Sequence, residues 1–303
     1  MEFEVFAEGL QFPEGPIAMD DGSIILVEIA RGTLSRVTPD GKISVIADLG
    51  GGPNGAAIGP DGAVYVCNNG GFAWHKQGDL LFPGHAAKDY SGGRIERVDI
   101  STGKSERIYE SCDGHDLKGP NDIVFDKEGG FYFTDLGKSY PRKRDAGGVY
   151  YAQPDGSNII EIEHNLVTPN GCGLSPDGKW LYYADTTPGR LWRYEIGGPG
   201  KIVPKVGFGP RAHLIATMPG LQYFDSLAVT ASGNVCVATI FNGGITSITP
   251  EGETTHYATR DTLTTNICFG GQDMRDAWIC CSSTGKLLKT RWPEAGLRLN
   301  YNA

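Results

Sequence analysis

The sequence predicts an all-β protein, a six-bladed β-propeller whose four-stranded antiparallel blades are closed by the N-terminal strand. One pattern recurs six times: a polar residue, an apolar strand, a Gly-containing turn and a second apolar strand. The copies start 40 to 67 residues apart, a period typical of propellers and solenoids. The 44 glycines and 18 prolines lie mostly at turns, which favours many short strands. We expect residues 1–303 to form one domain.

Each copy begins with an oxygen-bearing side chain, here called an anchor residue. The six anchors are Glu14, Asn54, Asn121, Asn170, Asp225 and Asn266. The strand pairs that they open span residues 14–27, 54–66, 121–133, 170–183, 225–237 and 266–279. Equivalent positions in a closed array lie on one ring around its axis, so the anchors predict a binding site at the mouth of the central channel.

A simpler interpretation is that Asn and Asp cap turns at strand starts. We favour it for Asn54 and Asn266. Turn capping does not explain two carboxylates, Glu14 and Asp225, converging with amides on one axis. For the set as a whole we therefore favour a site.

Two more strands complete each blade. Third strands that begin after glycine are expected at 31–37, 92–98, 147–152, 189–194, 243–248 and 285–290, and fourth strands at 43–47, 105–109, 159–163 and 254–258. Residues 297–303 offer little pattern for the last blade, whereas residues 3–7 match the other fourth strands. The N-terminal strand is therefore expected to complete the sixth blade, which removes open sheet edges.

Composition excludes several classes of partner. The net charge is −9 and no basic stretch is interleaved with aromatic residues, so nucleic acid is not expected. No apolar run approaches the ~20 residues that span a bilayer, and the acidic N-terminus lacks the features of a signal peptide. The seven cysteines include no Cys-x-x-Cys pair, and we expect them to be reduced residues of the core. We expect a cytoplasmic protein with no membrane and no obligate protein partner.

The chemistry of the anchors indicates a metal. Carboxylate and amide oxygens are hard ligands that suit Ca²⁺, Mg²⁺ or Mn²⁺ better than structural zinc. Two carboxylates neutralise a divalent ion, and neutral amides leave coordination positions for water or substrate. Such an ion polarises a carbonyl or phosphoryl oxygen and lowers the pKa of a bound water.

Several motifs resemble the gluconolactonase/regucalcin (senescence marker protein) family. They are Phe12-Pro-Glu-Gly-Pro, Gly119-Pro-Asn-Asp, Pro169-Asn-Gly-Cys-Gly-Leu-Ser-Pro-Asp-Gly, Asp225-Ser-Leu-Ala-Val and Cys268-Phe-Gly-Gly-Gln-Asp. The resemblance covers essentially the whole chain. It implies a six-bladed propeller with one divalent metal at the axis, calcium first and magnesium, manganese, zinc or iron as alternatives. The implied reaction opens a small-molecule sugar lactone to its hydroxy acid.

The resemblance also implies roles for particular anchors. Glu14, Asn170 and Asp225 match the family's metal ligands, and Asn121 matches a position that contacts metal or substrate. Asp225 would also be the catalytic general base. Relatives with the same architecture hydrolyse organophosphates, so a phosphotriester or other ester substrate is an alternative. A calcium-binding propeller without catalysis is a second alternative.

Three further residues are candidate substrate contacts. Where relatives acting on sugar lactones often have Arg, this chain has Gly119, and Lys118 is the neighbouring basic residue. Trp74 and His85 belong to residues 67–90, an unusually long connection expected on the anchor side of the ring. This connection is either a lid with a role in specificity or a loop that only packs over the neighbouring blade.

A few polar residues outside the anchors stay ambiguous. His75, His85 and His115 are acid/base candidates that no repeat places at the axis. Asp135 and Asp185 end second strands, as pocket residues or as strand-end caps.

Overall fold

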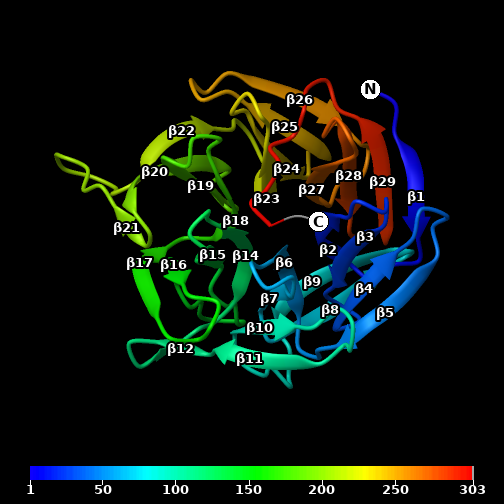
Figure 1. Ribbon diagram of the computed structural model, residues 1–303, viewed down its shortest axis with the longest axis horizontal. Coiled ribbons are helices and arrows are strands. Elements are labelled where there is room, and N and C mark those ends of the chain that lie inside the picture. Colours follow the sequence, from blue (N-terminus) through cyan, green and yellow to red (C-terminus); the bar gives the residue numbers. More distant parts are fainter. Residues whose placement is uncertain (302–303) are drawn as a thin grey trace.

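Six antiparallel sheets surround a common axis in the computed structural model, which describes residues 1–301 (Figure 1). Each sheet runs outward from a strand beside the axis to a strand at the rim. The six-bladed propeller predicted from the repeats is therefore confirmed. Among the described residues, no helix is long and apolar enough to cross a membrane.

The strands take the following order in the blades. The innermost strands are β2 (Pro13–Ala18), β6 (Pro53–Ile58), β14 (Pro120–Phe125), β18 (Pro169–Leu174), β23 (Tyr223–Val229) and β27 (Thr264–Gly270). The second strands are β3 (Ile24–Glu28), β7 (Val64–Asn68), β15 (Phe131–Asp135), β19 (Trp180–Asp185), β24 (Val235–Ile240) and β28 (Asp276–Cys281). The third strands are β4 (Thr33–Val37), β10 (Arg94–Val98), β16 (Gly147–Ala152), β20 (Arg190–Gly198), β25 (Gly244–Ile248) and β29 (Lys286–Arg291). The rim strands are β5 (Ile43–Asp48), β11 (Ser105–Tyr109), β17 (Ile159–Leu166), β22 (His213–Thr217), β26 (Thr254–Ala258) and β1 (Glu4–Glu8).

The N-terminal strand closes the ring as predicted. β1 pairs antiparallel with β29, so the sixth blade combines both ends of the chain. The Thr290 hydroxyl donates a 2.6 Å hydrogen bond to the Glu2 carbonyl, and Ala7 is buried against the blade. Without β1, the edge of β29 would have unpaired backbone groups, the arrangement that invites aggregation.

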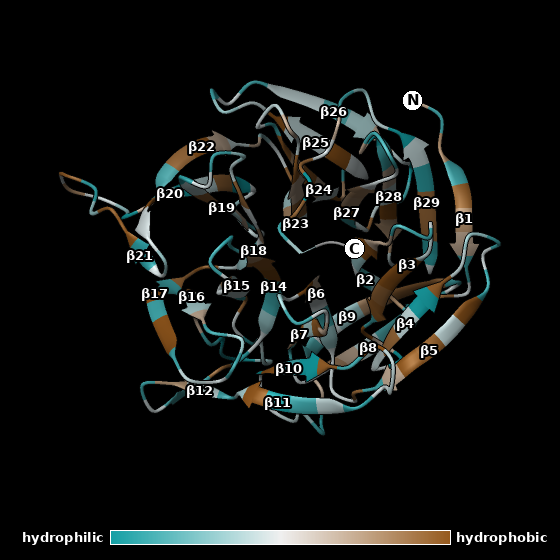
Figure 2. Cartoon of the chain, viewed as in Figure 1, coloured by the Kyte–Doolittle hydropathy of each residue, from teal (hydrophilic) through white to brown (hydrophobic). Residues whose placement is uncertain are grey.

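Burial decreases from the axis to the rim. The innermost and second strands are almost entirely buried, while rim strands such as β5 and β11 combine exposed, half-buried and buried residues. In Figure 2 these two rim strands carry both hydrophilic and hydrophobic bands. Aromatic side chains fill the spaces between blades. The rings of Tyr65 and Phe125, from adjacent blades, lie 5.1 Å apart. This interblade packing gives the ring a rigid frame for whatever lies at the axis.

The innermost strands approach one another more closely than side chains allow. A Cβ added at Gly55 would lie 2.3 Å from the Asn121 carbonyl oxygen, and one at Gly171 would lie 2.7 Å from Cα of Ser226. Gly15 has a φ of +52° and faces the backbone of the next blade at 2.7 Å. These glycines directly follow Glu14, Asn54 and Asn170, so three anchors lie where the strands converge most tightly.

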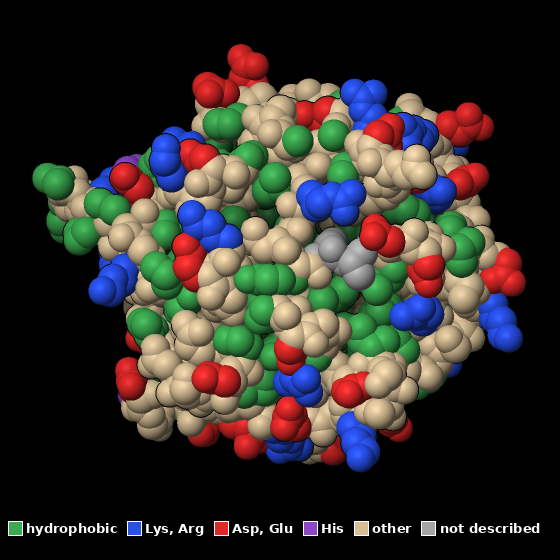
Figure 3. Space-filling view, in the orientation of Figure 1, with side chains coloured by type: hydrophobic (Ala, Val, Ile, Leu, Met, Phe, Trp, Pro, Cys, Tyr) green, Lys and Arg blue, Asp and Glu red, His purple; other side chains and the backbone are tan. Residues whose placement is uncertain are grey.

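Short segments cover both ends of the central channel. Two extra strands, β8 (Phe72–Gln77) and β9 (Leu80–Ala86), form a hairpin at the anchor end, where the Leu81 amide donates to the Ser283 carbonyl. At the opposite end the C-terminal segment crosses the ring: the Leu297 amide donates to the Val229 carbonyl and the Asn300 side chain to the Phe125 carbonyl. Figure 3 shows that end, with charged side chains mainly around the rim.

Two features of the outer blades were not predicted. The fourth strand of the fourth blade is β22, reached through a projecting segment that contains β21 (Lys201–Ile202) and exposes Val206 and Phe208 (Figures 1 and 3). A second small hairpin, β12 (Ser111–Cys112) and β13 (His115–Asp116), follows β11. Neither segment has a repeat-like pattern that would reveal it.

The closure of the ring predicts a large effect of a short deletion. Removing residues 1–8 deletes β1, which exposes the edge of β29 and apolar surface at ~25 cal/mol per Å². We expect the whole protein to unfold, seen as loss of the cooperative melt by circular dichroism. A control lacking only Met1 should melt like the parent. A 1–8 deletion with an unchanged Tm would show that β1 does not hold the ring closed.

Candidate functional site

All six anchor residues lie near the start of an innermost strand, as predicted. Each innermost strand also has a register shift against its partner at or beside the anchor. Such bulges redirect side chains that a regular strand would point into the sheet. The ring of anchors therefore depends on an irregularity repeated in every blade.

Of the two anchor carboxylates, Glu14 is held by more hydrogen bonds. Its side chain is 2% exposed, and Oε2 accepts hydrogen bonds from the Asn266 amide at 2.7 Å and from the Gly15 amide at 3.1 Å. The Asn266 carbonyl oxygen accepts the Ile267 amide at 2.8 Å, which fixes the orientation of the amide group. Asn266 thus acts as a support for Glu14 and is more than the strand-start cap that we expected.

Asn170 and Asp225 lie on neighbouring strands, β18 and β23. The Asn170 side chain donates to the Thr186 hydroxyl at 3.0 Å, and its oxygen receives the Ser226 hydroxyl at 3.5 Å. As a residue, Asp225 keeps some exposed surface, unlike Glu14, although its carboxyl group is surrounded by protein atoms. Asp225 therefore lies nearer to solvent than Glu14.

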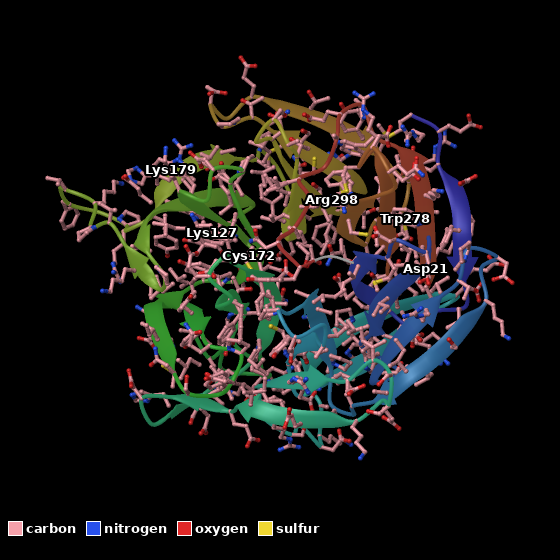
Figure 4. The ribbon with its side chains drawn as sticks, in the orientation of Figure 1. Asp21, Lys127, Cys172, Lys179, Trp278 and Arg298 are labelled. Carbon is pink, nitrogen blue, oxygen red and sulfur yellow. The ribbon has the colours of Figure 1, made fainter. Side chains whose placement is uncertain are left out.

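A third carboxylate, Asp122, belongs to the site and was not predicted. It is buried, and its oxygens accept the Ile123 amide at 2.9 Å and the Cys172 amide at 3.1 Å. Figure 4 shows Cys172 near the centre of the ring, with Asp21 and Trp278 farther out. Strict alternation would turn Asp122 away from Asn121, but the bulge between Pro120 and Ile123 removes that constraint.

Burial raises the pKa values of all three carboxylates, and Glu14 adds to the rise at the other two. Burial raises the pKa of Glu14 to about 7, against smaller opposing hydrogen bonds from Thr265, Asn266 and Gly15. Burial likewise raises the pKa of Asp122 to about 7, with a further rise from Glu14. Burial, then the neighbouring Glu14, raises the pKa of Asp225 well above its usual range.

No basic side chain in the described part of the chain pairs with these carboxylates. Within residues 1–301, no Lys, Arg or His lies within 4 Å of Glu14, Asp122 or Asp225 as an ion-pair partner. Buried carboxylates without a partner are costly when ionised. The arrangement therefore favours either bound protons or a bound cation.

The donor set fits a hard cation. Asn121 is 3% exposed, and its side-chain oxygen has no hydrogen-bond partner within residues 1–301. A buried acceptor without a donor is unusual and has the character of a ligand atom. No three His, Cys, Asp or Glu side chains of the described chain form a ligand cluster by themselves. The fit depends on amide oxygens joining the carboxylates, as in oxygen-rich calcium sites.

A cavity in the channel continues below the anchors. Its upper wall includes Asp122 and Asn266, its sides are mainly apolar, and Leu297 and Leu299 of the C-terminal segment close its far end. Figure 4 places Arg298, from the same segment, near the centre of that end. The anchor carboxylates therefore lie between an apolar cavity and the hairpin at the channel mouth.

The three candidate substrate contacts occupy different surroundings. Trp74 lies on β8 with its ring 5.0 Å from that of Phe12, two residues before Glu14. His85 is exposed on β9. The Lys118 ammonium lies 3.5 Å from the Asp116 carboxylate on an outer cleft. The structure brings Trp74 to the channel mouth, whereas the partly exposed Lys118 ammonium faces the Asp116 carboxylate.

The hairpin reaches across the mouth and does more than cover the neighbouring blade. Its side chains Trp74 and Phe82 pack on a cluster formed by Phe12, Ile29, Ile240 and Leu263, from blades one, five and six. The Ala86 amide donates to the Ser139 carbonyl of blade three at 2.8 Å. This path agrees with the lid interpretation.

The carboxylates at the ends of second strands act as caps. Asp135 accepts the amides of Lys118, Gly119 and Gly137 at 2.7–2.8 Å. Asp185 accepts the amide and hydroxyl of Thr168. These bonds hold the loops that lead into β14 and β18, so both residues position anchors.

Known proteins resemble this chain along most of its length. It is 27% identical to a gluconolactonase of Zymomonas mobilis over 281 residues, covering 82% of this chain and 70% of that protein. It is 30% identical to the lactonase drp35 of Staphylococcus saprophyticus, covering 82% and 69%. A solved regucalcin from Agrobacterium tumefaciens, described as a calcium-binding protein, superimposes with a TM-score of 0.73 at 18% identity, covering 97% of both chains. This last likeness concerns the fold.

The family model described as the SMP-30/gluconolactonase/LRE-like region matches residues 12–283, from the motif around the first anchor into the sixth blade. With the fold and the ring of anchors described above, this match shows that the chain belongs to the SMP-30/gluconolactonase/LRE-like family.

Proposed function

We propose that this protein is a divalent-metal-dependent lactonase that hydrolyses a lactone to its hydroxy acid. One observation carries the proposal: Glu14 and Asp225 lie close enough at the axis for Glu14 to raise the pKa of Asp225, and within residues 1–301 no basic side chain pairs with either. A fold gains nothing from such a pair unless a cation or a reaction uses it. Relatives named gluconolactonase and lactonase support the reaction class.

Glu14, Asn170 and Asp225 would hold the metal, with Asn121 as a fourth ligand or a substrate contact. A divalent cation bound there would supply Lewis acidity toward a carbonyl oxygen and toward water. Calcium is the first candidate because the donors are all oxygens and because a structural neighbour is described as calcium-binding. Magnesium, manganese, zinc and iron are the alternatives.

Asp225 would be the general base. It is partly exposed at the channel mouth, whereas Glu14 is buried and its Oε2 is occupied by Asn266 and Gly15. A base must reach the water whose proton it takes. Asp225 would take that proton as the water oxygen attacks the lactone carbonyl carbon. It would return the proton to the ring oxygen as the ring C–O bond breaks, which gives a hydroxyl and a carboxylic acid that loses its own proton to solvent.

The first test is a panel of substrates. Proton release should follow addition of sugar lactones, stop after chelation and return when Ca²⁺ or Mn²⁺ is restored. Activity confined to phosphotriesters or simple esters would indicate the ester hydrolase alternative. Calcium binding with no turnover of any substrate would indicate a binding propeller and would contradict the proposal.

The second test separates ligand from base. Glu14→Gln removes a charged ligand but leaves Asp225, so excess metal should recover part of the activity. Asp225→Asn keeps an oxygen that coordinates but cannot take a proton, so kcat should fall by roughly 10²–10⁴ even at saturating metal. Steady-state kinetics over a metal titration measures both.

Asp20→Asn, an exposed carboxylate near the first blade's turn, is the matched control and should behave like the parent. Full recovery of Asp225→Asn with added metal would show that Asp225 is only a ligand. Asp122 would then be the next carboxylate to test as the base.

The raised pKa values also predict how stability depends on pH and metal. Glu14 and Asp122 keep their protons to about pH 7 in the folded chain, whereas the unfolded chain loses them near pH 4. The stability that they contribute is present below pH 4 and is lost as pH rises through 7. Metal binding to the ionised carboxylates should offset this loss.

Differential scanning calorimetry can check this. With chelator, we expect Tm to fall between pH 5 and pH 8. Excess Ca²⁺ should raise Tm at pH 8, by about 5 °C at a hundredfold excess over Kd, and should change it little at pH 5. A Ca²⁺ effect of equal size at both pH values would contradict carboxylate ligation at this site.

A further inference from the structure

A buried lysine lies at the base of the hairpin that covers the channel mouth. Lys138, in the connection between β15 and β16, is 1% exposed. Its ammonium donates to the Asn69 backbone carbonyl at 2.8 Å and to the Asn69 side-chain oxygen at 3.0 Å. Asn69 follows β7 and precedes the hairpin, so the lysine of blade three is bonded to the segment from which the hairpin departs.

Aromatic rings complete the surroundings of the ammonium group. It lies 3.8 Å from the ring centroid of Phe72 and 5.2 Å from that of Tyr90. Phe72 is the first residue of β8, and Tyr90 lies just beyond β9. One side-chain nitrogen therefore contacts both ends of the 72–90 segment, and in its ammonium form cation–π attraction is strongest for such a desolvated group.

Further hydrogen bonds fix the residues that surround the Lys138 ammonium. The Asn69 side-chain oxygen also accepts the Gly71 amide at 2.9 Å, and the Tyr90 hydroxyl donates to the Lys118 carbonyl at 2.6 Å. The Lys138 carbonyl accepts the Asp145 amide, which fixes its loop. Burial lowers the pKa of Lys138 to about 7, against a smaller rise from the nearby Asp135. No carboxylate within residues 1–301 forms an ion pair with Lys138.

We propose that Lys138 positions the β8–β9 hairpin over the channel mouth, and through the hairpin limits which substrates reach Asp225. The second half of this statement rests on the proposed lactonase function, whereas the first does not. A lysine buried without a carboxylate partner is costly, so it is expected only where its contacts do a particular task. Here Lys138 contacts Asn69, where the chain leaves blade two, Phe72 at the start of β8, and Tyr90, where the chain returns after β9.

Hydrogen–deuterium exchange of the full chain tests the positioning role without any substrate. Lys138→Met keeps the length and apolar stem but removes the donors and the charge. We expect amides of residues 73–86, including Leu81, to exchange at least tenfold faster, while amides of β14 and β18 keep their protection. Lys143→Met is the matched control, because Lys143 lies 4.5 Å from the Tyr140 ring on the same loop but is exposed.

A second variant covers the case in which Lys138→Met does not fold. Phe72→Leu retains an apolar side chain but removes the aromatic face, and should accelerate exchange of the same amides. In a double-mutant cycle the two effects should be less than additive, because both remove one interaction. Unchanged hairpin exchange in folded Lys138→Met, or in Phe72→Leu where Lys138→Met is unfolded, would overturn the proposal.

Kinetics addresses the second half. If the hairpin limits access, Lys138→Met should change KM for bulky relative to small lactones by tenfold or more, with kcat for the smallest lactone within about twofold of the parent. Equal loss of kcat for all lactones, with normal exchange in the hairpin, would assign Lys138 a different role. Absence of lactonase activity in the parent would refute the proposed function and leave the exchange result to decide the positioning role.

Discussion

The close approach of the six innermost strands at the axis is the constraint on which the rest of this structure depends. Gly15, Gly55 and Gly171 lie against the next strand's backbone, leaving no room for a Cβ. Backbone bulges beside the anchors turn polar side chains toward the same axis. The convergence that packs the ring therefore also concentrates negative charge, and a cation at the axis would relieve that charge. On this view stability and function have one origin.

Closure at three places keeps this arrangement intact. β1 completes the sixth blade, so the ring cannot open at the junction of its ends. The C-terminal segment closes the far end of the channel through Leu297 and Leu299, and the hairpin covers the anchor end. Limited access of water lowers the local dielectric, which explains the raised pKa values and strengthens any charge interaction at the axis.

The sequence predicted the architecture because repetition reports directly on symmetry. Six anchors at a propeller-like period were enough to place Glu14, Asn170 and Asp225 on one ring. A strand pattern at the N-terminus, where no blade of its own follows, was enough to predict how the ring closes. Asp122 was not predicted because the side-chain alternation of a regular strand puts neighbouring residues on opposite faces. The bulge that changes this cannot be predicted from the sequence. β22 was not predicted because a long connection separates it from β20, so it does not fall at the spacing that the other fourth strands share. The role of Lys138 was not predicted because its partners, Asn69, Phe72 and Tyr90, are distant in sequence and lie outside the repeated pattern. The side chains that hold the site follow the repeat, whereas those that cover it do not.

The most direct test of the central claim is to locate the cation. In crystals grown with Mn²⁺, an anomalous difference map should show one peak on the propeller axis, within coordination distance of oxygens from Glu14, Asn170 and Asp225. The same map for Asp225→Asn should show a weaker peak at that position. A map of the parent with no peak at the axis, or with its strongest peak elsewhere, would contradict the account, because the uncompensated carboxylates would then have another explanation.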